Sequence, residues 1–397
     1  MAFSALFITG LATLLLLVFI LREEVSHRKR LRQIPFRLCV TGTRGKTSVT
    51  RLLASLLRES GQRVFAKTTG TSPKMFLPDG SEEIFPRRGF PTVLEDIKFI
   101  RKANRGNAQA LVTELMGIRP ETLSVESLRI NQPHILVITN VRLDHTEHMG
   151  LSLDRIAECF ASAIPPKGIV FIPEEECLPI FEQVARRRGA KLIPVSRDLS
   201  PSELPSEYLF KKNSRLVLAV AEYLGLPDGH LQSGISPSSV DIGKLNAWNL
   251  NLDSSGRKWT AVNLFEANDP QSTREILDLL GKQRNLPDLK KVGLFNLRPD
   301  RGERTLQWLE SIRQDQFSDI QEFVFLGRQS PLVVRRLRKK GLRARCFALN
   351  EKWPEKVMEK IRSGIDGDIL LLGMMNMGGM GERLTSYWNQ TGAPYDI

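Results

Sequence analysis

Residues 36–48 read FRLCVTGTRGKTS, and this stretch decides the fold of the chain. Its first six residues have the length and apolar character of a buried strand, and residues 47–60 have the apolar spacing of a helix. The glycines between them allow a tight turn in which backbone amides point at phosphate oxygens. A lysine adds positive charge, and a threonine hydroxyl can bind Mg²⁺. The pattern predicts a nucleotide phosphate loop formed by Gly42, Thr43, Arg44, Gly45, Lys46, Thr47 and Ser48.

Apolar runs of strand length alternate with helical patterns along the rest of the chain, as in α/β folds whose parallel sheet is covered on both faces. We predict buried strands at 36–41, 110–113, 134–139, 168–172, 259–265, 291–295, 322–326 and 368–372. We predict helices at 47–60, 215–224, 273–280 and 330–340. The polar stretch 251–258 separates two such series. We therefore expect a central P-loop ATPase domain at 34–255 and a smaller, Rossmann-like α/β domain at 256–397.

Residues 2–21, AFSALFITGLATLLLLVFIL, carry no charge. A helix of this length matches the roughly 30 Å hydrocarbon core of a bilayer, whereas a removed signal peptide would need a basic start and a small-residue cleavage site. Residues 22–32 hold five Lys or Arg against two Glu, a cytoplasmic flank by the positive-inside rule. We expect residues 1–33 to be a single-pass anchor in the cytoplasmic membrane with a basic juxtamembrane linker, an outside N-terminus and cytoplasmic catalytic domains. A buried core helix is the alternative.

The chain has 397 residues and a net charge of +13, of which the flank of the anchor contributes three units. The remaining +10 favours an anionic partner. Only 7% of the residues are aromatic, and the sequence contains no nucleic-acid-binding motif. Both observations argue against a nucleic-acid-binding protein. Four cysteines without a C-x-x-C pair argue against a zinc site or a disulfide framework.

The phosphate loop departs from the pattern G-x-x-x-x-G-K-[ST], because Val40 stands where the first glycine would be. A chance glycine-rich turn is the alternative. The shortened form G-T-x-G-K-T resembles the ATP loop of the Mur ligase superfamily. Further segments are similar to that family's signatures and follow in its order: KTTGT at 67–71, TNVRLDHTEHMG at 139–150, DIGK at 241–244, ANDP at 267–270 and RPDR at 298–301. The resemblance covers roughly residues 34–390.

The resemblance implies that ATP and Mg²⁺ are bound and that Thr47, Glu114 and His145 are metal ligands. Glu114 follows the predicted strand 110–113, and ligands of such sheets bind at the carboxyl ends of strands. A solvated or helix-capping glutamate is the alternative. His145 follows another strand end and could face the same crevice, whereas His148, one turn further on, fits a surface position.

The resemblance also implies that the second domain completes the nucleotide site. Asn268 and Asp269 suit adenine and the ribose hydroxyls, although Asn-Asp-Pro is equally a turn with a helix N-cap. Asp300 and Arg301 match the Asp-Arg element that the family turns towards ATP, and a solvated surface loop is the alternative for the arginines of this segment. The expected catalytic residues are Lys46, Glu114, His145 and Arg301.

Two departures narrow the resemblance. The phosphate loop starts at residue 42, behind the expected anchor, without the separate nucleotide-sugar domain of the Mur ligases of peptidoglycan. The anchor and the segments NVRLDHTEHMG, ANDPQST, NLRPDRGERT and GMMNMGGMGE are instead similar to the ligase subunits of capsule-type poly-γ-glutamate synthases. Many Mur ligases also carry a modified lysine about fifteen residues after the metal histidine, where this chain has Phe160. The resemblance therefore leaves open how a second metal would be held.

This resemblance implies an ATP-dependent amide ligase that activates glutamate, or the end of the growing poly-γ-glutamate chain, as an acyl phosphate and joins it to an amine through the γ-carboxyl group. Since one helix cannot form a conduit, membrane subunits of a synthase or export complex are expected partners, besides the bilayer around residues 2–21. A homo-oligomer stays open. The alternatives are another Mur-type ligase, acting on a peptidoglycan precursor or folate, and a P-loop NTPase switch that makes no bond.

Overall fold

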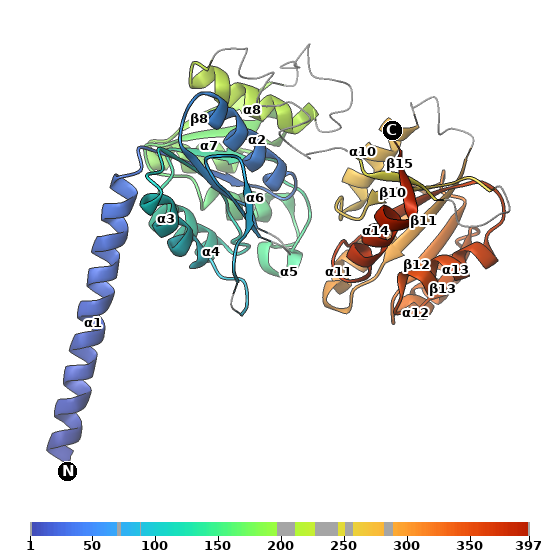
Figure 1. Ribbon diagram of the computed structural model, residues 1–397, viewed down its shortest axis with the longest axis horizontal. Helices are drawn as coiled ribbons and strands as arrows, with labels where there is room; N and C mark the ends of the chain where they lie inside the picture. Colours follow the sequence, from blue (N-terminus) through green and yellow to red (C-terminus); the bar gives the residue numbers. More distant parts are fainter. Residues whose placement is uncertain are drawn as a thin grey trace. The chain divides into compact units, whose positions relative to one another are not determined.

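The computed structural model describes residues 2–69, 73–87, 89–196, 211–226, 245–250, 257–281 and 289–395 (Figure 1). Three segments singled out in the sequence lie wholly or partly outside these residues: 241–244, Gly70 and Thr71 of the KTTGT turn, and most of the polar stretch at 251–258. The chain divides into an N-terminal and a C-terminal compact unit, and each unit has its own sheet. The predicted α/β fold is therefore confirmed for both.

The sheet of the first unit has eight described strands in the order β4-β3-β2-β5-β1-β6-β7-β8. Their bounds are β1 Phe36–Thr41, β2 Val64–Lys67, β3 Lys74–Phe76, β4 Glu82–Ile84, β5 Ala110–Glu114, β6 Ile135–Ile138, β7 Ile169–Pro173 and β8 Lys191–Val195. All pairs from β2 to β8 are parallel, and β3 and β4 add an antiparallel edge. Val40 lies opposite Glu114, and Thr41 lies opposite Ile138. The phosphate loop therefore leaves the sheet between the ends of β5 and β6.

Helices cover both faces of this sheet (Figure 1). Their bounds are α2 Lys46–Glu59, α3 Glu95–Arg105, α4 Pro120–Val125, α5 Thr146–Met149, α6 Leu153–Ala161, α7 Pro179–Arg188 and α8 Lys211–Tyr223, with a π-helix at Glu126–Asn131. α2 buries Leu52, Leu53, Leu56 and Leu57, whose spacing forms one apolar stripe. The predictions of helices at 47–60 and 215–224 are confirmed. The periodic spacing of apolar residues in a helix is a local signal that a single sequence contains.

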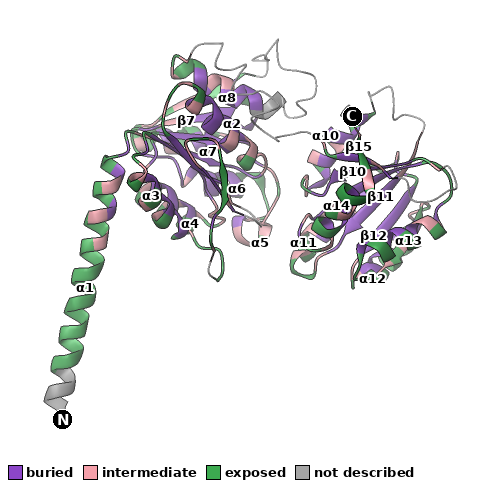
Figure 2. Ribbon diagram, in the orientation of Figure 1, coloured by how far each residue is buried: buried purple, intermediate pink, exposed green. Residues whose placement is uncertain are grey.

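The N-terminal helix α1 is continuous from Ala2 to Arg32. Its described side chains from residue 7 to 21 are exposed, whereas its last turns are docked on the first unit (Figure 2). Leu31 is buried in a cluster with Phe99 of α3. Residues 22–32 thus form the docked end of a helix instead of the expected linker. In the part of the chain that the structure describes, no helix has an apolar stretch long enough to cross a membrane.

The sheet of the second unit has the order β13-β12-β11-β14-β10-β9-β15. Its strands are β9 Ala247–Leu250, β10 Trp259–Leu264, β11 Lys290–Asn296, β12 Glu322–Leu326, β13 Arg345–Leu349, β14 Ile369–Met374 and β15 Gly392–Tyr395. The strands from β13 to β10 are parallel, and β9 and β15 pair antiparallel. Because β9 pairs with β10, residues 247–250 belong to the second sheet, and the expected boundary at 255 is too late in the chain.

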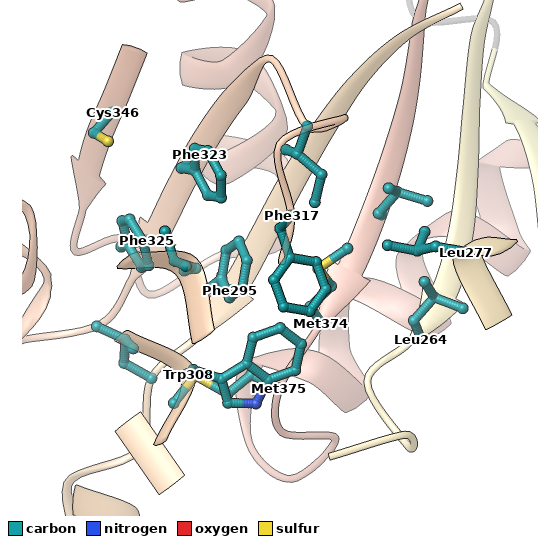
Figure 3. Packing of buried hydrophobic residues seen from close by; sticks show 14 of the residues in the cluster. Leu264, Leu277, Phe295, Trp308, Phe317, Phe323, Phe325, Cys346, Met374 and Met375 are labelled. Atoms are coloured by element: carbon teal, nitrogen blue, oxygen red, sulfur yellow. The ribbon is translucent and has the colours of Figure 1, made fainter. Parts of the chain in front are cut away.

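Two apolar clusters lie on opposite sides of the second sheet, because neighbouring residues of a strand point to opposite faces. Phe295 of β11 packs with Leu277 and Trp308, which come from α10 (Pro270–Leu280) and α11 (Gly302–Arg313) (Figure 3). Leu294 belongs to the other cluster, with Trp388 of α14. The remaining helices are α12 Ser330–Lys339, α13 Pro354–Gly364 and α14 Met380–Thr391. Helices that leave neighbouring strands for opposite faces open a crevice at the carboxyl ends of those strands.

Candidate active site

The phosphate loop joins β1 to α2 through two glycines in the left-handed region of backbone space. Gly42 has φ +127°, and a Cβ atom there would lie 2.2 Å from Thr139 Oγ1. Gly45 has φ +75° and is the N-cap of α2. Only glycine combines this φ with so close an approach. Ser48, in the first turn of α2, is half-buried. The predicted strand, turn and helix are therefore confirmed as a local structure.

Residues after β6 hold the other side of the loop. Asn140 Oδ1 accepts a hydrogen bond from the Arg44 amide at 3.0 Å, and Asn140 Nδ2 donates one to the Arg44 carbonyl at 3.0 Å. Thr139 Oγ1 donates to the same carbonyl at 2.6 Å. The Thr43 hydroxyl accepts from the Arg142 amide at 3.0 Å. Two side chains that sequence reasoning gave no role, Thr139 and Asn140, therefore shape the loop, and their place directly after a strand is the signal that could have found them.

Lys46 points back over the loop that precedes it. Its Nζ atom donates a 2.9 Å hydrogen bond to the Gly42 carbonyl. Burial lowers the pKa of Lys46, and the nearby charge of Glu114 acts in the opposite direction. A phosphate group at this position would favour the charged ammonium.

Glu114 is nearly inaccessible at the end of β5 and lies at the centre of a set of short contacts. Its Oε2 atom accepts hydrogen bonds from Thr47 Oγ1 at 2.8 Å and from the Thr69 amide at 3.1 Å. Its Oε1 atom accepts from Thr69 Oγ1 at 2.6 Å. A carboxylate and a hydroxyl are oxygen donors of the kind that Mg²⁺ prefers, so the donor set fits this ion. Thr69 belongs to the predicted KTTGT turn, but its contact with Glu114 needed the tertiary structure.

His145 lies beside Asp144 in the segment that follows β6. His145 Nε2 is 3.8 Å from Asp144 Oδ2, and Arg44 pairs with the same oxygen at 3.2 Å. His145 has φ +48° and precedes the short helix α5. Among the described residues, no group of three or more His, Cys, Asp or Glu side chains forms a ready metal cage. The structure thus brings Thr47 and Glu114 together, and His145 stays a prediction.

Phe160, at the position of the modified lysine of many Mur ligases, is a core residue. It is buried on α6 together with Ile138 and Ile156. An apolar ring in this cluster cannot replace a modified lysine as a metal ligand, because it offers no oxygen or nitrogen donor.

Asp269 in the second unit caps a helix. Its Oδ1 atom accepts from the Ser272 amide at 2.9 Å, and Asp269 is buried at the start of α10. This is the N-cap alternative of the sequence pattern. Asn268 has φ +59°, and its Oδ1 atom accepts from Arg304 at 2.9 Å.

Arg304 also donates to Asn376 Oδ1 at 2.7 Å, so it joins the loop after β10 to the loop after β14. Asn376 Nδ2 in turn donates to the Asn296 carbonyl at the end of β11 at 2.8 Å. These amides meet at the carboxyl ends of three adjacent strands, and sequence reasoning missed Asn296 and Asn376. An isolated asparagine near a strand end gives too weak a signal in one sequence.

Asp300 and Arg301 lie in a 3-10 helix, Pro299–Arg301, directly before α11, where Asp300 is exposed and Arg301 is half-buried. Arg298 donates to both carboxylate oxygens of Asp300, at 3.0 and 2.7 Å, and Arg301 is 3.9 Å from it. The hydrogen bond from Arg298 lowers the pKa of Asp300. This bidentate pair holds the Arg298 guanidinium on Asp300. Binding of an anion by the neighbouring arginines of the segment is compatible with this arrangement.

Comparison with known proteins places each unit in a family. Residues 40–230 match the model of the Mur ligase middle domain, and residues 250–391 match that of the poly-γ-glutamate synthase CapB C-terminal domain. The capsule biosynthesis protein CapB of Bacillus anthracis is 30% identical over 96% of this chain and 82% of its own length. The PGA synthase CapB of Bacillus subtilis strain 168 is 30% identical over 94% of this chain and 95% of its own length.

A solved structure supports the fold independently. The bifunctional folylpolyglutamate synthase/dihydrofolate synthase of Yersinia pestis, complexed with AMPPNP and Mn, has a TM-score of 0.64 at 14% identity. The match covers 92% of this chain and 93% of that one. At this identity the likeness shows the fold alone, whereas the relatives at 30% identity extend over nearly the whole chain. The chain thus belongs to the CapB family of poly-γ-glutamate synthases, within the Mur ligase superfamily.

Proposed function

We propose that this chain is a membrane-anchored, ATP-dependent amide ligase that polymerises glutamate through γ-carboxyl linkages. The observation that carries the proposal is the contact of the phosphate loop with Glu114 through Thr47, in a chain of the CapB family. The B. subtilis relative is a PGA synthase, which supports glutamate as the substrate. The nucleotide analogue in the Y. pestis structure supports ATP as the phosphoryl donor.

The reaction has two steps. A γ-carboxylate oxygen attacks the γ-phosphorus of ATP, ADP leaves, and an acyl phosphate forms. The amine nitrogen of the next glutamate unit then attacks the acyl carbon, the amide bond forms, inorganic phosphate leaves and the amine loses a proton. Such chemistry depends on positioning, on neutralising the transferred charge and on excluding water.

Residues of the first unit bind the phosphates and the metal ions in this proposal. Backbone amides of the loop at 42–46 and the N-terminus of α2 bind the β- and γ-phosphates, and Lys46 adds a positive charge. Thr47 and Glu114 would hold Mg²⁺, which when bound neutralises phosphate charge. His145 beside Asp144 is the proposed ligand for a second metal.

The second unit contributes the proposed nucleotide contacts of Asn268 and Asp269 and the charged turn with Asp300 and Arg301. The hydrogen bond that caps α10 fixes the position of Asp269 next to Asn268. Arg301 is the catalytic member of the turn in this proposal, because a cation near the transferred phosphoryl group offsets charge that develops in the transition state.

Residues 2–21 anchor the chain in the cytoplasmic membrane in this proposal, with the N-terminus outside. The support is the uncharged run of the sequence, the exposure of the apolar side chains from residue 7 to 21, and the basic flank. Membrane subunits of a synthase or export complex are the proposed partners, since one helix cannot carry the polymer across.

The experiment is incorporation of radiolabelled glutamate in membranes supplied with ATP, comparing the wild type with Glu114→Ala. The proposal expects polymer and ADP in the wild type and loss of both in the variant. Nucleotide turnover that is independent of glutamate would indicate a switch, and turnover that depends on a wall precursor or folate would indicate another Mur-type ligase. Either result would overturn the proposal.

A further inference from the structure

Four polar side chains are buried together behind the end of β5, and we call them the inner polar cluster: Lys67, Asp96, Glu126 and Asn131. Each is at most 2% exposed. Burying charged groups costs free energy unless they are paired and hydrogen-bonded. None of the four belongs to the phosphate loop or to the proposed metal ligands, so their burial needs another explanation.

The cluster is internally connected. Lys67 Nζ donates to Asp96 Oδ1 at 2.7 Å, and Asn131 Nδ2 donates to Asp96 Oδ2 at 2.7 Å. Asn131 Nδ2 also lies 3.0 Å from the Glu126 carbonyl. The Lys67 ammonium stands over the Phe85 ring, 5.4 Å from its centre. One lysine, one aspartate and one amide therefore link β2, α3 and the π-helix.

Two members of the cluster are linked to the segments that surround Glu114, one through hydrogen bonds and one through the chain itself. The Glu126 carboxylate accepts hydrogen bonds from the Met116 amide at 2.9 Å and from the Gly117 amide at 2.8 Å. Lys67 ends β2 and stands two residues before Thr69, which donates both of its hydrogen bonds to Glu114. The cluster thus holds the turn that follows Glu114 and the turn that contacts it.

The local structure around Glu126 is specialised. Glu126 starts a π-helix, a rare form that is frequent at functional sites. A Cβ atom at Gly117 would lie 2.7 Å from the Leu123 Cα atom and 3.0 Å from Glu126 Oε2, so the turn is packed closely on this carboxylate. Asn131 Oδ1 is buried and finds no hydrogen-bond partner among the residues that the structure describes, a cost that a purely structural amide would avoid.

We infer that the inner polar cluster positions Glu114: Glu126 and the Lys67–Asp96 pair orient its carboxylate for the divalent cation that accompanies ATP. These are positioning residues, because they act through Glu114 and its neighbours. The inference rests on the proposed function, in which Glu114 and Thr47 hold the cation. Groups that orient a metal ligand typically change metal affinity or activity by about 10- to 100-fold when they are altered.

The variant Glu126→Gln tests the inference, because it keeps the shape of the side chain but replaces one acceptor oxygen by a donor. Ser127→Ala is the matched control: Ser127 is equally buried on the same π-helix, and its hydroxyl donates to the Ala163 carbonyl at 2.6 Å, away from Glu114. Both variants remove a buried hydrogen bond from the π-helix. Only the first removes a contact to the turn after Glu114.

The measurement is Mn²⁺ binding to the purified full-length protein with a non-hydrolysable ATP analogue, followed by the electron paramagnetic resonance of free Mn²⁺, with thermal unfolding in parallel. We expect Glu126→Gln to weaken Mn²⁺ binding about tenfold or more, and Ser127→Ala to leave it close to the wild type at a similar loss of stability. Equal Mn²⁺ binding in all three proteins, or equal weakening in both variants, would overturn the inference.

A second variant keeps the inference open to test if Glu126→Gln does not fold. Asp96→Asn removes the charge that pairs with Lys67 and is also expected to weaken Mn²⁺ binding, whereas unchanged binding would count against a positioning role.

Glutamate-dependent ADP release by the wild type is measured separately. A wild type that binds Mn²⁺ and the analogue but releases no ADP with glutamate would overturn the proposed function and leave the positioning role standing.

Discussion

Thr47 Oγ1 donates a 2.8 Å hydrogen bond to Glu114 Oε2, although 67 residues separate them in the chain. The contact joins the first turn of α2 to the end of β5, two neighbours in space because β5 lies beside β1. It places the hydroxyl that follows the phosphate-loop lysine next to the carboxylate best suited to a metal ion. The site can therefore be tested from both sides of this contact.

Replacing either partner of this contact is expected to raise the concentration of Mg²⁺ needed for half-maximal activity. Glu114→Gln removes the charge and should lower ligase activity by about 100-fold or more, whereas Thr47→Val, which removes a neutral donor, should have a smaller effect. The measurement is ADP release against Mg²⁺ concentration. Glu121→Gln, on the exposed side of α4, is the control. An unchanged Mg²⁺ requirement in Glu114→Gln would contradict the assignment.

Lys46→Met keeps the apolar stem of the side chain and is expected to slow phosphoryl transfer strongly. The ammonium is the cation that lies on the loop, bonded to the Gly42 carbonyl, and its removal should lower turnover about 100-fold or more. Turnover and equilibrium binding of an ATP analogue are to be measured together. Lys98→Met, an exposed lysine of α3, should behave like the wild type. Full activity of Lys46→Met would exclude the loop as the phosphate site.

Gly42→Ala should destabilise the first unit through a close contact as well as through backbone strain. Its Cβ atom would lie 2.2 Å from Thr139 Oγ1, at φ +127°, and the expected loss is about 2 kcal/mol or more. Gly61→Ala is the matched control, because Gly61 has φ +83° but nothing within 4 Å of a Cβ atom. Chemical denaturation measures both. Equal losses in the two variants would show that the Thr139 contact does not matter.

The docking of α1 is expected to weaken in acid through Glu23. Hydrogen bonds from Arg30 and from Arg101 of α3 lower the pKa of Glu23 below its ordinary value of 4.5. A lowered folded-state pKa contributes stability at neutral pH, and this contribution is lost as the pH falls below 4.5 through the folded-state value.

Glu23→Gln measures this contribution. Because the carboxylate is partly exposed and screened by solvent, the variant should cost at most about 1 kcal/mol at neutral pH. The difference in unfolding free energy between the wild type and the variant should shrink as the pH falls below 4.5 and vanish once the carboxyl group is protonated in the folded state as well. It should also shrink in high salt. A difference that persists in acid would show that the charge of Glu23 is not its source.

Two deletions separate the proposed anchor from the docked end of α1. Deleting residues 2–21 should release the protein from membranes and leave the thermal unfolding of the first unit unchanged, because the described side chains of this stretch, from residue 7 to 21, are exposed. Deleting residues 2–33 also removes Leu31 and His27 and should cost about 3 kcal/mol. Membrane flotation and thermal unfolding measure the two effects. Continued membrane association of the shorter deletion would contradict the anchor.

Much of the fold was predictable because its signals are local. The strand at 36–41 and the strand at 322–326 have the observed bounds, since a short buried run between turn residues is typical of parallel sheets. β9 and β15 were not predicted, because each is only four residues long, and β15 also gains its pairing from β9, a strand distant in the chain. The docked end of α1 escaped prediction for the same reason. Its charged residues indicate a membrane flank, and the surface that buries Leu31 comes from α3.

The phosphate loop, the alternation of strands and helices, and Glu114 as a candidate ligand could all be predicted from the sequence, because turn glycines, the apolar period and strand ends are signals that extend over only a few residues. Only the tertiary structure decided which groups meet: Thr69 and Thr47 at Glu114, Asn140 at the loop, and the inner polar cluster behind the site. It also gave Asp269 its capping role. Hydrogen bonds between distant segments depend on sheet order and register, which a single sequence does not encode in any local pattern.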